Sequence, residues 1–355
     1  MTQPTTAVIV DDSALMRQML SEMLGSDPEI EVLGTAADPI AARALIKSTN
    51  PDVITLDVEM PKMDGLTFLE KIMTLRPTPV LMISSLTQKG ADTTIQALEL
   101  GAIDFVAKPT IDLKEGMTAK RDEIVRKVKA AARAKLRPRS SPSARKPKAR
   151  QAGRVLRSTE QVILIGASTG GVNAIRDIVC TLPVDCPAVL VTQHMPAGFT
   201  RSFAGRLDAD SAVSVAEAAH GQRAMPGQVL IAPGNRHLEL SRSGADYICR
   251  LRDSAAVSGH RPSVDVLFRS AAKCAGPNAV GVILTGMGRD GAAGMLELRR
   301  SGARTLGQDE ASSIVYGMPK AAWDIGAVES QVSLSKVVDT VLDLCSQRAA
   351  RKVHI

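Results

Sequence analysis

One serine in the chain stands in a setting that suits nucleophilic chemistry. Residues 162–172 read VILIGASTGGV, an apolar run typical of a buried strand, followed by small residues around Ser168. The stretch matches the pattern G-x-S-x-G, in which small neighbours let a serine hydroxyl project from a sharp turn between a strand and a helix. The motif alone does not decide the matter, because serine is also a favoured N-cap of a helix.

A phosphate-binding loop is an alternative interpretation of the same stretch. A dinucleotide site of the G-x-G-x-x-G type placed on Gly166 requires glycine at position 168 and an acidic residue after the next strand. The sequence has Ser168 instead, and the next apolar run, PAVLVTQHMP, ends in Gln193 and His194. The dinucleotide alternative therefore lacks its central glycine and its carboxylate, and we disfavour it.

A histidine and an aspartate follow two other predicted strands. His194 comes after AVLVTQ, and Asp290 follows VGVILTGMGR in a glycine-rich turn. Because the carboxyl ends of parallel strands lie at one edge of a sheet, we expect both side chains to meet Ser168 there. An imidazole activates serine by taking its proton, and a carboxylate holds that imidazole in the right tautomer. The turn amides of Thr169 and Met287 are the expected donors to an oxyanion.

Chain order and a second histidine leave questions open. The order Ser, His, Asp differs from the Ser, acid, His order of α/β-hydrolases, which argues against that fold. His260, with Asp265 five residues later, is the rival base. His194 is preferred because its strand follows that of the serine in a βαβ unit. His237, in NRHLEL, is expected on a strand that faces solvent.

The first part of the chain carries a second set of polar residues at strand ends. Residues 7–109 alternate short apolar runs with helical patterns five times, which indicates a doubly wound parallel sheet. The polar residues that follow its predicted strands are Asp11, Asp12, Asp57, Ser84 and Lys108.

Three carboxylates at one crevice repel one another unless a cation lies among them, and carboxylate oxygens suit Mg²⁺. A carboxylate held beside a divalent ion and an ammonium group can accept a phosphoryl group. Asp57 is the predicted acceptor, and Ser84 is the predicted hydrogen-bond donor to the new phosphate. This part of the chain is therefore predicted to be a switch.

Length and charge divide the chain into two domains and a connector. A chain of 355 residues exceeds one ordinary core. Residues 133–157 contain ten Lys and Arg and no acid, which exceeds the net charge of +7 of the whole chain. That segment has no aromatic residues to stack bases, so we interpret it as a flexible tether and expect no nucleic-acid binding. The predicted boundaries are a first domain at 1–125, a linker at 126–157 and a second domain at 158–350.

The second domain begins another alternation of strands and helices. Its predicted strands are VILIGAS, AVLVTQH, QVLIAPG, YICRLRD and AVGVILTGMG, which indicates a second doubly wound, mainly parallel α/β sheet.

Other properties indicate the compartment. No apolar run approaches the roughly 18 residues needed to span a bilayer, and the N-terminus has no secretion-signal pattern. The five cysteines show neither C-x-x-C spacing nor a paired framework, which fits free thiols in a reducing cytoplasm. We therefore expect a cytoplasmic location and no membrane insertion.

Two groups of motifs resemble known families. DD at 11–12, LDVEMPKMDG around Asp57, MISS at 82–85 and KP at 108–109 resemble a response-regulator receiver domain, a flavodoxin-like (βα)5 fold. GASTGG at 166–171, TQHMP at 192–196, APG at 232–234, GHRPSVDVLF at 259–268 and LTGMGRDGA at 284–292 resemble the chemotaxis protein-glutamate methylesterases, the CheB family. The second resemblance covers both domains in the same order.

For the first domain, the resemblance implies Mg²⁺ bound by the side chains of Asp11, Asp12 and Asp57 and by the backbone carbonyl of Glu59. It also implies phosphorylation of Asp57 by a histidine kinase. Phe105 stands where receivers often have tyrosine, so an aromatic rotamer switch here would lack a hydroxyl.

For the second domain, the resemblance implies catalysis by Ser168, His194 and Asp290, assisted at the oxyanion by Thr169 and Met287, with no cofactor. The implied substrates are glutamate γ-methyl esters on methyl-accepting chemoreceptors, together with receptor glutamines for deamidation. Phosphorylation would relieve inhibition of the catalytic domain. The alternative is a response regulator whose second domain only binds a partner or nucleic acid.

Overall fold

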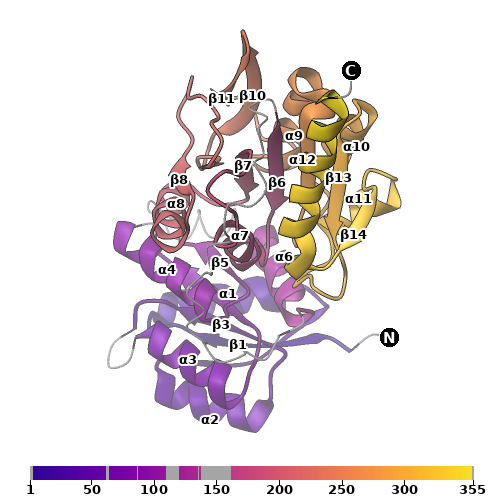
Figure 1. The fold of residues 1–355 in the computed structure, drawn as a ribbon. Coiled ribbons are helices and arrows are strands. Elements are labelled where there is room, and N and C mark those ends of the chain that lie inside the picture. Colours follow the sequence, from indigo (N-terminus) through magenta and orange to yellow (C-terminus); the bar gives the residue numbers. More distant parts are fainter. Residues whose placement is uncertain are drawn as a thin grey trace. The chain divides into compact units, whose positions relative to one another are not determined.

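The computed structural model describes residues 3–60, 64–85, 87–108, 120–134, 136 and 161–353, leaving aside the side chains of residues 88 and 348–353. The chain divides into two compact units, Met1–Arg139 and Ser140–Ile355 (Figure 1). Most of the predicted linker, from residue 137 onward, lies outside the described residues. Among the described residues, no helix combines the length and the apolar character needed to cross a bilayer.

The first unit is built on a five-stranded parallel sheet with the strand order β2-β1-β3-β4-β5. This confirms the predicted doubly wound α/β fold. Its elements are β1 (Thr5–Val10), α1 (Ala14–Gly25), β2 (Ile30–Ala36), α2 (Pro39–Thr49), β3 (Val53–Asp57), α3 (Gly65–Leu75), β4 (Val80–Ser84), α4 (Gln88–Leu100), β5 (Asp104–Ala107) and α6 (Arg121–Ala132).

The strand order decides where the polar residues of the first unit meet. Strand β1 lies between β2 and β3, so the turns that follow β1 and β3 are neighbours at one edge. Strands β3 and β4 are buried along their whole length, as expected for a parallel sheet covered on both faces. The apolar strands thus bring Asp11 and Asp57 to one crevice.

Helix α6 extends the first unit beyond the boundary placed at residue 125. Val128 and Ala131 on this helix are completely buried, and the Lys127 ammonium donates a hydrogen bond of 2.6 Å to the carbonyl of Phe105 on β5. The first unit therefore extends at least to Ala132, the end of this helix.

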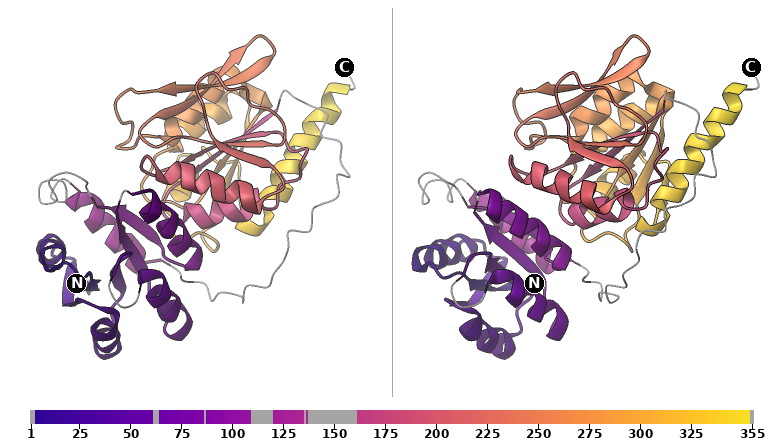
Figure 2. Two further views of the ribbon diagram at one scale, coloured as in Figure 1. Left: turned by 90° about the vertical axis from the view of Figure 1, so that its left-hand side faces the viewer. Right: turned by 60° about the vertical axis from the view of Figure 1, so that its left-hand side comes forward.

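The second unit is built on a seven-stranded parallel sheet with the strand order β14-β13-β12-β6-β7-β9-β8, and a separate antiparallel hairpin, β10-β11 (Figure 2). The elements are β6 (Val162–Ala167), α7 (Gly171–Val179), β7 (Ala188–Gln193), α8 (Phe199–Asp210), β8 (Ser214–Glu217), β9 (Gln228–Ile231), β10 (His237–Ser243), β11 (Asp246–Arg252), α9 (Val264–Cys274), β12 (Ala279–Ile283), α10 (Ala292–Arg300), β13 (Arg304–Gln308), α11 (Met318–Asp324), β14 (Ser330–Val332) and α12 (Val337–Val353), with 3₁₀ turns at Gly276–Asn278 and Leu334–Lys336.

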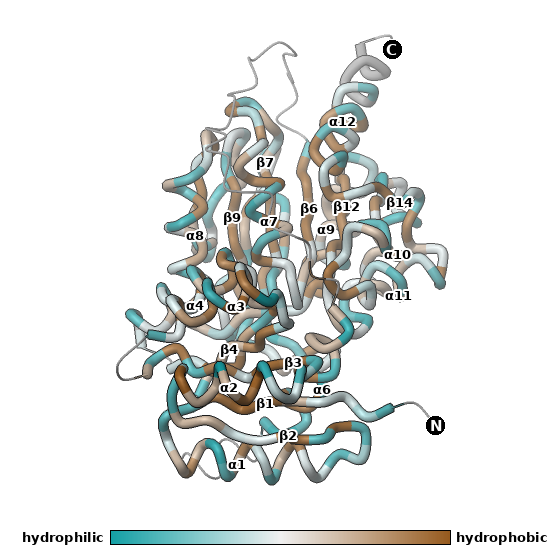
Figure 3. Tube along the Cα trace, turned by 90° about the horizontal axis from the view of Figure 1, so that it is seen from below, coloured by the Kyte–Doolittle hydropathy of each residue, from teal (hydrophilic) through white to brown (hydrophobic). Residues whose placement is uncertain are grey.

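Strand β6 shows why a continuous apolar run predicts a central strand. Ile163 and Ile165 face α7 and α12 on one side of the sheet. Val162 and Leu164 belong to the core on the other side, which includes residues of α9, α10 and the β10-β11 hairpin. Both faces of the strand are covered, so every residue is apolar or small. Figure 3 shows the hydrophobic residues gathered along strands such as β1 and β6.

Three strands of the second sheet were not predicted, and one prediction needs correction. Strands β8, β13 and β14 are short and contain polar residues, so they give little apolar signal. The stretch YICRLRD does form a strand, β11, but it pairs in the antiparallel hairpin and lies outside the parallel sheet.

The burial of α6 leads to a first prediction. A fragment of residues 1–125 should have a free energy of unfolding about 2–4 kcal/mol lower than a fragment of residues 1–134, because full burial of one valine contributes roughly 1.5–3 kcal/mol. Urea denaturation followed by circular dichroism measures the difference. Equal stability of the two fragments would show that the last turns of α6 are not part of the fold.

Candidate active site and carboxylate cluster

Ser168 occupies a sharp turn between β6 and α7. Its carbonyl accepts a hydrogen bond of 2.7 Å from the Gly171 N–H, and its own N–H donates to the carbonyl of Thr285 at 3.1 Å. Gly170, between Ser168 and the helix, has a φ of +77°, which glycine adopts without strain. The turn therefore ties the serine to the neighbouring strand end after β12.

The flanking glycines allow close packing around this turn. A Cβ atom on Gly166 would lie 2.2 Å from Cγ1 of Val264, and one on Gly171 would lie 2.1 Å from Oε1 of Gln193. Both distances are far shorter than any van der Waals contact. The glycine-rich character of the stretch is thus explained by packing of the turn against α9 and β7, without a phosphate group.

His194 lies between Ser168 and Asp290. Its Nδ1 is 3.1 Å from the Ser168 hydroxyl, and its Nε2 is 2.8 Å from Oδ2 of Asp290. An ionised carboxylate can only accept, so Nε2 carries the proton and Nδ1 offers its lone pair to the serine hydroxyl. The structure brings together all three residues that the sequence placed at the strand ends.

The carboxylate of Asp290 is held by the N-terminus of α9. Oδ2 accepts the N–H of Val264 at 2.7 Å, and Oδ1 accepts the hydroxyl of Ser263 at 2.8 Å and the N–H of Asp265 at 3.2 Å. Burial alone would raise the pKa of Asp290, but the hydrogen bond from His194, the positive charge of that ring when it is protonated, and the hydrogen bonds from the start of α9 hold the pKa below its ordinary value. The carboxylate therefore stays ionised beside the imidazole.

Two histidines other than His194, His260 and His237, bear on this site or on its interpretation. The ring of His260 stacks on the ring of His194, with centroids 3.7 Å apart and planes 10° from parallel. The carboxylate of Asp265, its predicted partner, accepts the Gly294 N–H at 2.7 Å and the Ser258 hydroxyl at 3.3 Å. Burial raises the pKa of Asp265 above its ordinary value.

The expectation that His237 faces solvent is wrong. His237 begins β10 as predicted, but it is completely buried. Its Nε2 lies 3.0 Å from the carbonyl of Ala255, and its Nδ1 accepts the N–H of Ser263 at 3.2 Å. Alternation along a short strand did not reveal that α9 covers this position. His237 thereby supports the helix end that holds Asp290.

Gln193 is a site residue that sequence reasoning missed. Its side-chain amide donates to the carbonyl of Ser168 at 3.0 Å and to that of His194 at 3.3 Å. A polar residue at the buried end of a strand was the available signal, since Gln193 is 4% exposed. The side chain fixes the serine turn relative to the histidine turn.

The two expected oxyanion donors lie in adjoining turns. Thr169 follows Ser168, and its carbonyl accepts the hydroxyl of Thr285 at 3.0 Å. Met287 follows Gly286, where an added Cβ would come within 2.8 Å of the Cβ of Ser168. The role of these backbone amides stays a prediction.

In the first unit, three carboxylates converge at the strand edge. Oxygen atoms of Asp11, Asp12 and Asp57 all lie within 4.8 Å of one another, with Asp12 exposed and the other two buried. The Lys108 ammonium lies 3.1 Å from Oδ2 of Asp11 and 2.9 Å from Oδ2 of Asp57. This all-oxygen donor set suits a hard divalent cation such as Mg²⁺.

The electrostatics of the cluster show why a cation would fit. Burial raises the pKa of Asp57 to about 6, and the nearby Asp11 carboxylate adds to this, although Lys108 opposes both. Burial also raises the pKa of Asp11. Burial would lower the pKa of Lys108, but the two carboxylates raise it overall. One ammonium thus incompletely compensates the carboxylates that surround it.

The remaining predicted residues of the first unit lie around this cluster. The Glu59 N–H donates to Oδ1 of Asp57 at 3.3 Å. Ser84 is buried, and its hydroxyl bonds to the carbonyls of Ser85 and Gly90 at 3.3 Å, so it is held toward α4. Phe105 is 3% exposed, with the Lys127 ammonium 5.4 Å from its ring centroid. Their roles in switching stay predictions.

Comparison with known protein families decides the assignment. The family model described as CheB methylesterase matches residues 163–341, and the model described as response regulator receiver domain matches residues 7–119. The chain belongs to the CheB methylesterase family. It is thus a hydrolase of that family with an N-terminal receiver domain, as the sequence motifs indicated.

Individual relatives of this CheB-family chain match along almost its whole length. A protein-glutamate methylesterase/protein-glutamine glutaminase of Xanthomonas campestris is 55% identical over 351 residues, covering 97% of this chain and 98% of the relative. A protein with the same description from Pseudomonas aeruginosa is 52% identical, covering 98% of each. The crystal structure of the Thermotoga maritima CheB methylesterase catalytic domain is 35% identical with a TM-score of 0.51, covering 52% of this chain and 98% of that domain.

The close packing of the serine turn in this CheB-family enzyme leads to a second prediction. Gly171→Ala should lower the free energy of unfolding by about 1–3 kcal/mol, because the new methyl group overlaps the Gln193 side chain. Gly205→Ala is the matched control. Gly205 lies inside α8 with nothing within 4 Å of its would-be Cβ, so alanine should raise stability by roughly 0.5–1 kcal/mol. Chemical denaturation of the full chain measures both, and equal effects would contradict the packing argument.

Proposed function

We propose that this protein hydrolyses glutamate γ-methyl esters on the cytoplasmic helices of methyl-accepting chemoreceptors, and deamidates receptor glutamines. The observation that carries the proposal is the continuous hydrogen-bonded line from Asp290 through His194 to Ser168. The descriptions of its relatives as protein-glutamate methylesterases and protein-glutamine glutaminases support the choice of substrate.

In the first half-reaction, Oγ of Ser168 attacks the γ-carbonyl carbon while its proton passes to Nδ1 of His194. The backbone amides of Thr169 and Met287 donate hydrogen bonds to the oxyanion that forms. The tetrahedral intermediate collapses when His194 returns the proton to the leaving atom, which is the methoxy oxygen of the ester or the amide nitrogen of glutamine. Methanol departs, or ammonia from a glutamine, and an acyl-enzyme remains on Ser168.

In the second half-reaction, His194 takes a proton from water, which attacks the acyl carbon. The returned proton restores the Ser168 hydroxyl, and the substrate leaves with a free γ-carboxylate. Asp290 accepts the hydrogen bond from Nε2–H throughout and stabilises the imidazolium, because its own pKa is held low enough to keep it ionised. His260, stacked on the imidazole, is in a position to limit rotation of the ring.

The triad geometry gives a third prediction. Ser168→Ala should lower methanol release from methylated receptor by about 10⁴-fold or more, and Asp290→Asn should lower it by a similar factor, because the imidazole loses its nucleophile or its orienting carboxylate. Thermal unfolding of Ser168→Ala should resemble that of the wild type. Retention of near-normal methanol release by folded Ser168→Ala would remove the serine from the reaction.

For the receiver, we propose that a histidine kinase phosphorylates Asp57. The side chains of Asp11, Asp12 and Asp57 and the backbone carbonyl of Glu59 would hold Mg²⁺, which would neutralise charge on the phosphoryl oxygens. Lys108 already bridges Asp11 and Asp57 and would bind the new phosphate. Ser84 would exchange its bonds to the carbonyls of Ser85 and Gly90 for one to the phosphate. Phe105 would respond by a change in rotamer.

A fourth prediction tests the phosphoryl acceptor. With a small-molecule phosphodonor and Mg²⁺, methanol release by the wild type should rise, and Asp57→Asn should abolish the increase while leaving basal release intact. Chelation of divalent ions should likewise abolish the increase and leave basal methanol release intact, because the proposed Mg²⁺ site lies in the receiver and not at the catalytic triad. A full phosphodonor response from Asp57→Asn would place the acceptor elsewhere.

Inhibition by the receiver gives a fifth prediction. An unphosphorylated receiver joined by a tether remains at high effective concentration near the catalytic unit. Residues 158–355 alone should therefore release methanol faster than the unphosphorylated full chain. Equal or slower release by the isolated unit would contradict inhibition by occlusion.

A further inference from the structure

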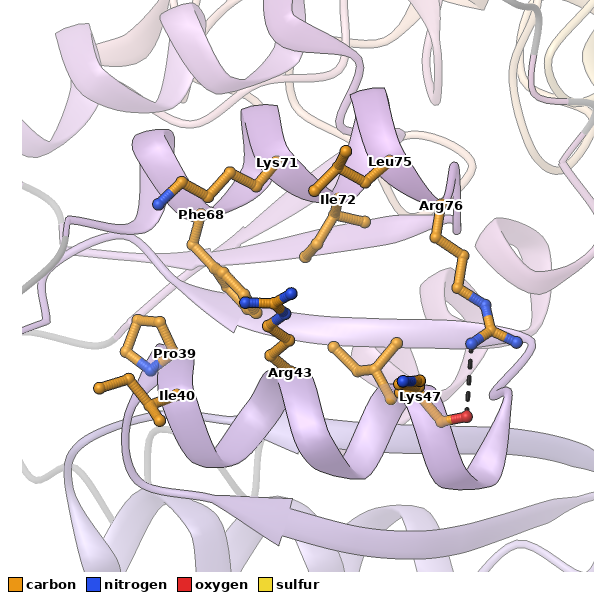
Figure 4. A pocket seen from close by; sticks show the side chains of 10 residues that line it. Pro39, Ile40, Arg43, Lys47, Phe68, Lys71, Ile72, Leu75 and Arg76 are labelled. Atoms are coloured by element: carbon orange, nitrogen blue, oxygen red, sulfur yellow. Dashed lines mark hydrogen bonds between the residues drawn. The ribbon is translucent and has the colours of Figure 1, made fainter.

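A surface groove of the receiver is not used by either site described above. It lies between α2 and α3 and has a volume of about 430 Å³. Figure 4 shows side chains from the two helices pointing toward one another across it. Its lining residues are Pro39, Ile40, Arg43, Ile46 and Lys47 around α2, and Phe68, Lys71, Ile72, Leu75 and Arg76 around α3.

The floor of the groove is apolar and its apolar sides are exposed. Ile46, Phe68 and Ile72 form buried floor positions. Ile40 and Leu75 line the groove and are 73% and 75% exposed, respectively. A groove lined by large exposed apolar side chains is typical of an interaction site.

The charged residues that line the groove all have the same sign. Arg43, Lys47, Lys71 and Arg76 are basic and exposed, and none of the ten lining residues is acidic. Arg76 is fixed across the two helices. Its guanidinium donates to Oδ1 of Asn50 at 2.6 Å and to the carbonyl of Lys47 at 3.4 Å (Figure 4). Asp38, which precedes these residues, accepts the N–H groups of Ile40 and Ala41 as the cap of α2.

From this combination we propose that the groove binds an acidic amphipathic helix of a partner protein. An apolar stripe would cover Ile40 and Leu75, and carboxylates on both flanks would meet the basic rim. The lining residues of α2 span positions 39–47. At 1.5 Å per residue this is roughly 13 Å, enough for two to three turns of a bound helix with anchors at i, i+3, i+4 and i+7.

Charge argues against two other occupants. The segment of this chain at 133–157 has ten Lys and Arg and no acid, so it would be repelled by the rim. A second copy packed symmetrically through the same groove would bring the basic residues of both copies together. A partner helix with carboxylates beside apolar side chains would pack against the apolar floor and form ion pairs with the basic rim.

The test uses the full chain and a fluorescein-labelled helical peptide with leucines at i, i+3, i+4 and i+7 and glutamates on both flanks. Fluorescence anisotropy should show binding that weakens when ionic strength rises. Arg43→Glu and Lys47→Glu should each weaken binding roughly three- to tenfold, and Ile40→Ser and Leu75→Ser should do so to a similar extent. These side chains are exposed, so the fold should tolerate each change.

Matched controls distinguish binding in the groove from nonspecific electrostatic and hydrophobic binding. Arg126→Glu on α6 and Val184→Ser in the second unit change exposed residues outside the groove and should leave the affinity unchanged. A peptide with lysine in place of every glutamate should not bind.

Several outcomes would overturn the proposal. The acidic peptide does not bind, or the lysine peptide binds equally well, or the control variants lose as much affinity for the acidic peptide as the groove variants do. Alternatively, the protein binds phosphatidylserine vesicles but not the peptide, and the groove variants weaken vesicle binding. That result would show that the groove binds an anionic membrane surface. Because the readout is binding, failure here leaves the hydrolase proposal standing, and inactivity of the triad leaves the groove proposal standing.

Discussion

The carboxylate of Asp290 at the N-terminus of α9 is the interaction on which the catalytic site depends. Four hydrogen-bond donors converge on it, three from the start of α9 and one from His194. The unpaired N–H groups and the dipole at a helix start favour a negative charge there. Because the carboxylate is buried and ionised, it dictates which nitrogen of His194 carries the proton, and hence which nitrogen faces Ser168.

The fold supplies the other constraint, which is the order of the strands. Strand β6 lies between β12 and β7, so the turns that carry Ser168, Asp290 and His194 adjoin one another. Glycines at 166 and 171 let α9 and Gln193 approach the serine turn. In the receiver, the corresponding arrangement brings the carboxylates of Asp11 and Asp57 to Lys108. Each sheet thus brings residues distant in sequence together at the carboxyl ends of its strands.

Much of this could be predicted from the sequence, because apolar runs mark parallel strands and polar residues directly after them mark the edge where ligands bind. That rule placed Ser168, His194 and Asp290 together. It did not predict that Nδ1, rather than Nε2, faces the serine, since ring orientation depends on the position of α9. The burial of His237 and the bond from Gln193 to the serine turn also depend on packing between elements far apart in the sequence. The α2-α3 groove could not be predicted for the same reason, because its basic residues come from two helices.

Catalysis by Ser168 therefore depends most directly on which nitrogen of the His194 ring carries the proton. Nitrogen-15 NMR of the full chain, with His194 assigned by comparison with His194→Gln, reports which ring nitrogen carries a proton in the neutral imidazole. We expect a protonated Nε2, coupled to Asp290, and an unprotonated Nδ1 that shifts in Ser168→Ala. A proton on Nδ1 with an unprotonated Nε2 would contradict the account, because Nδ1 could not then accept the serine proton and the bond from Nε2 to Asp290 could not exist.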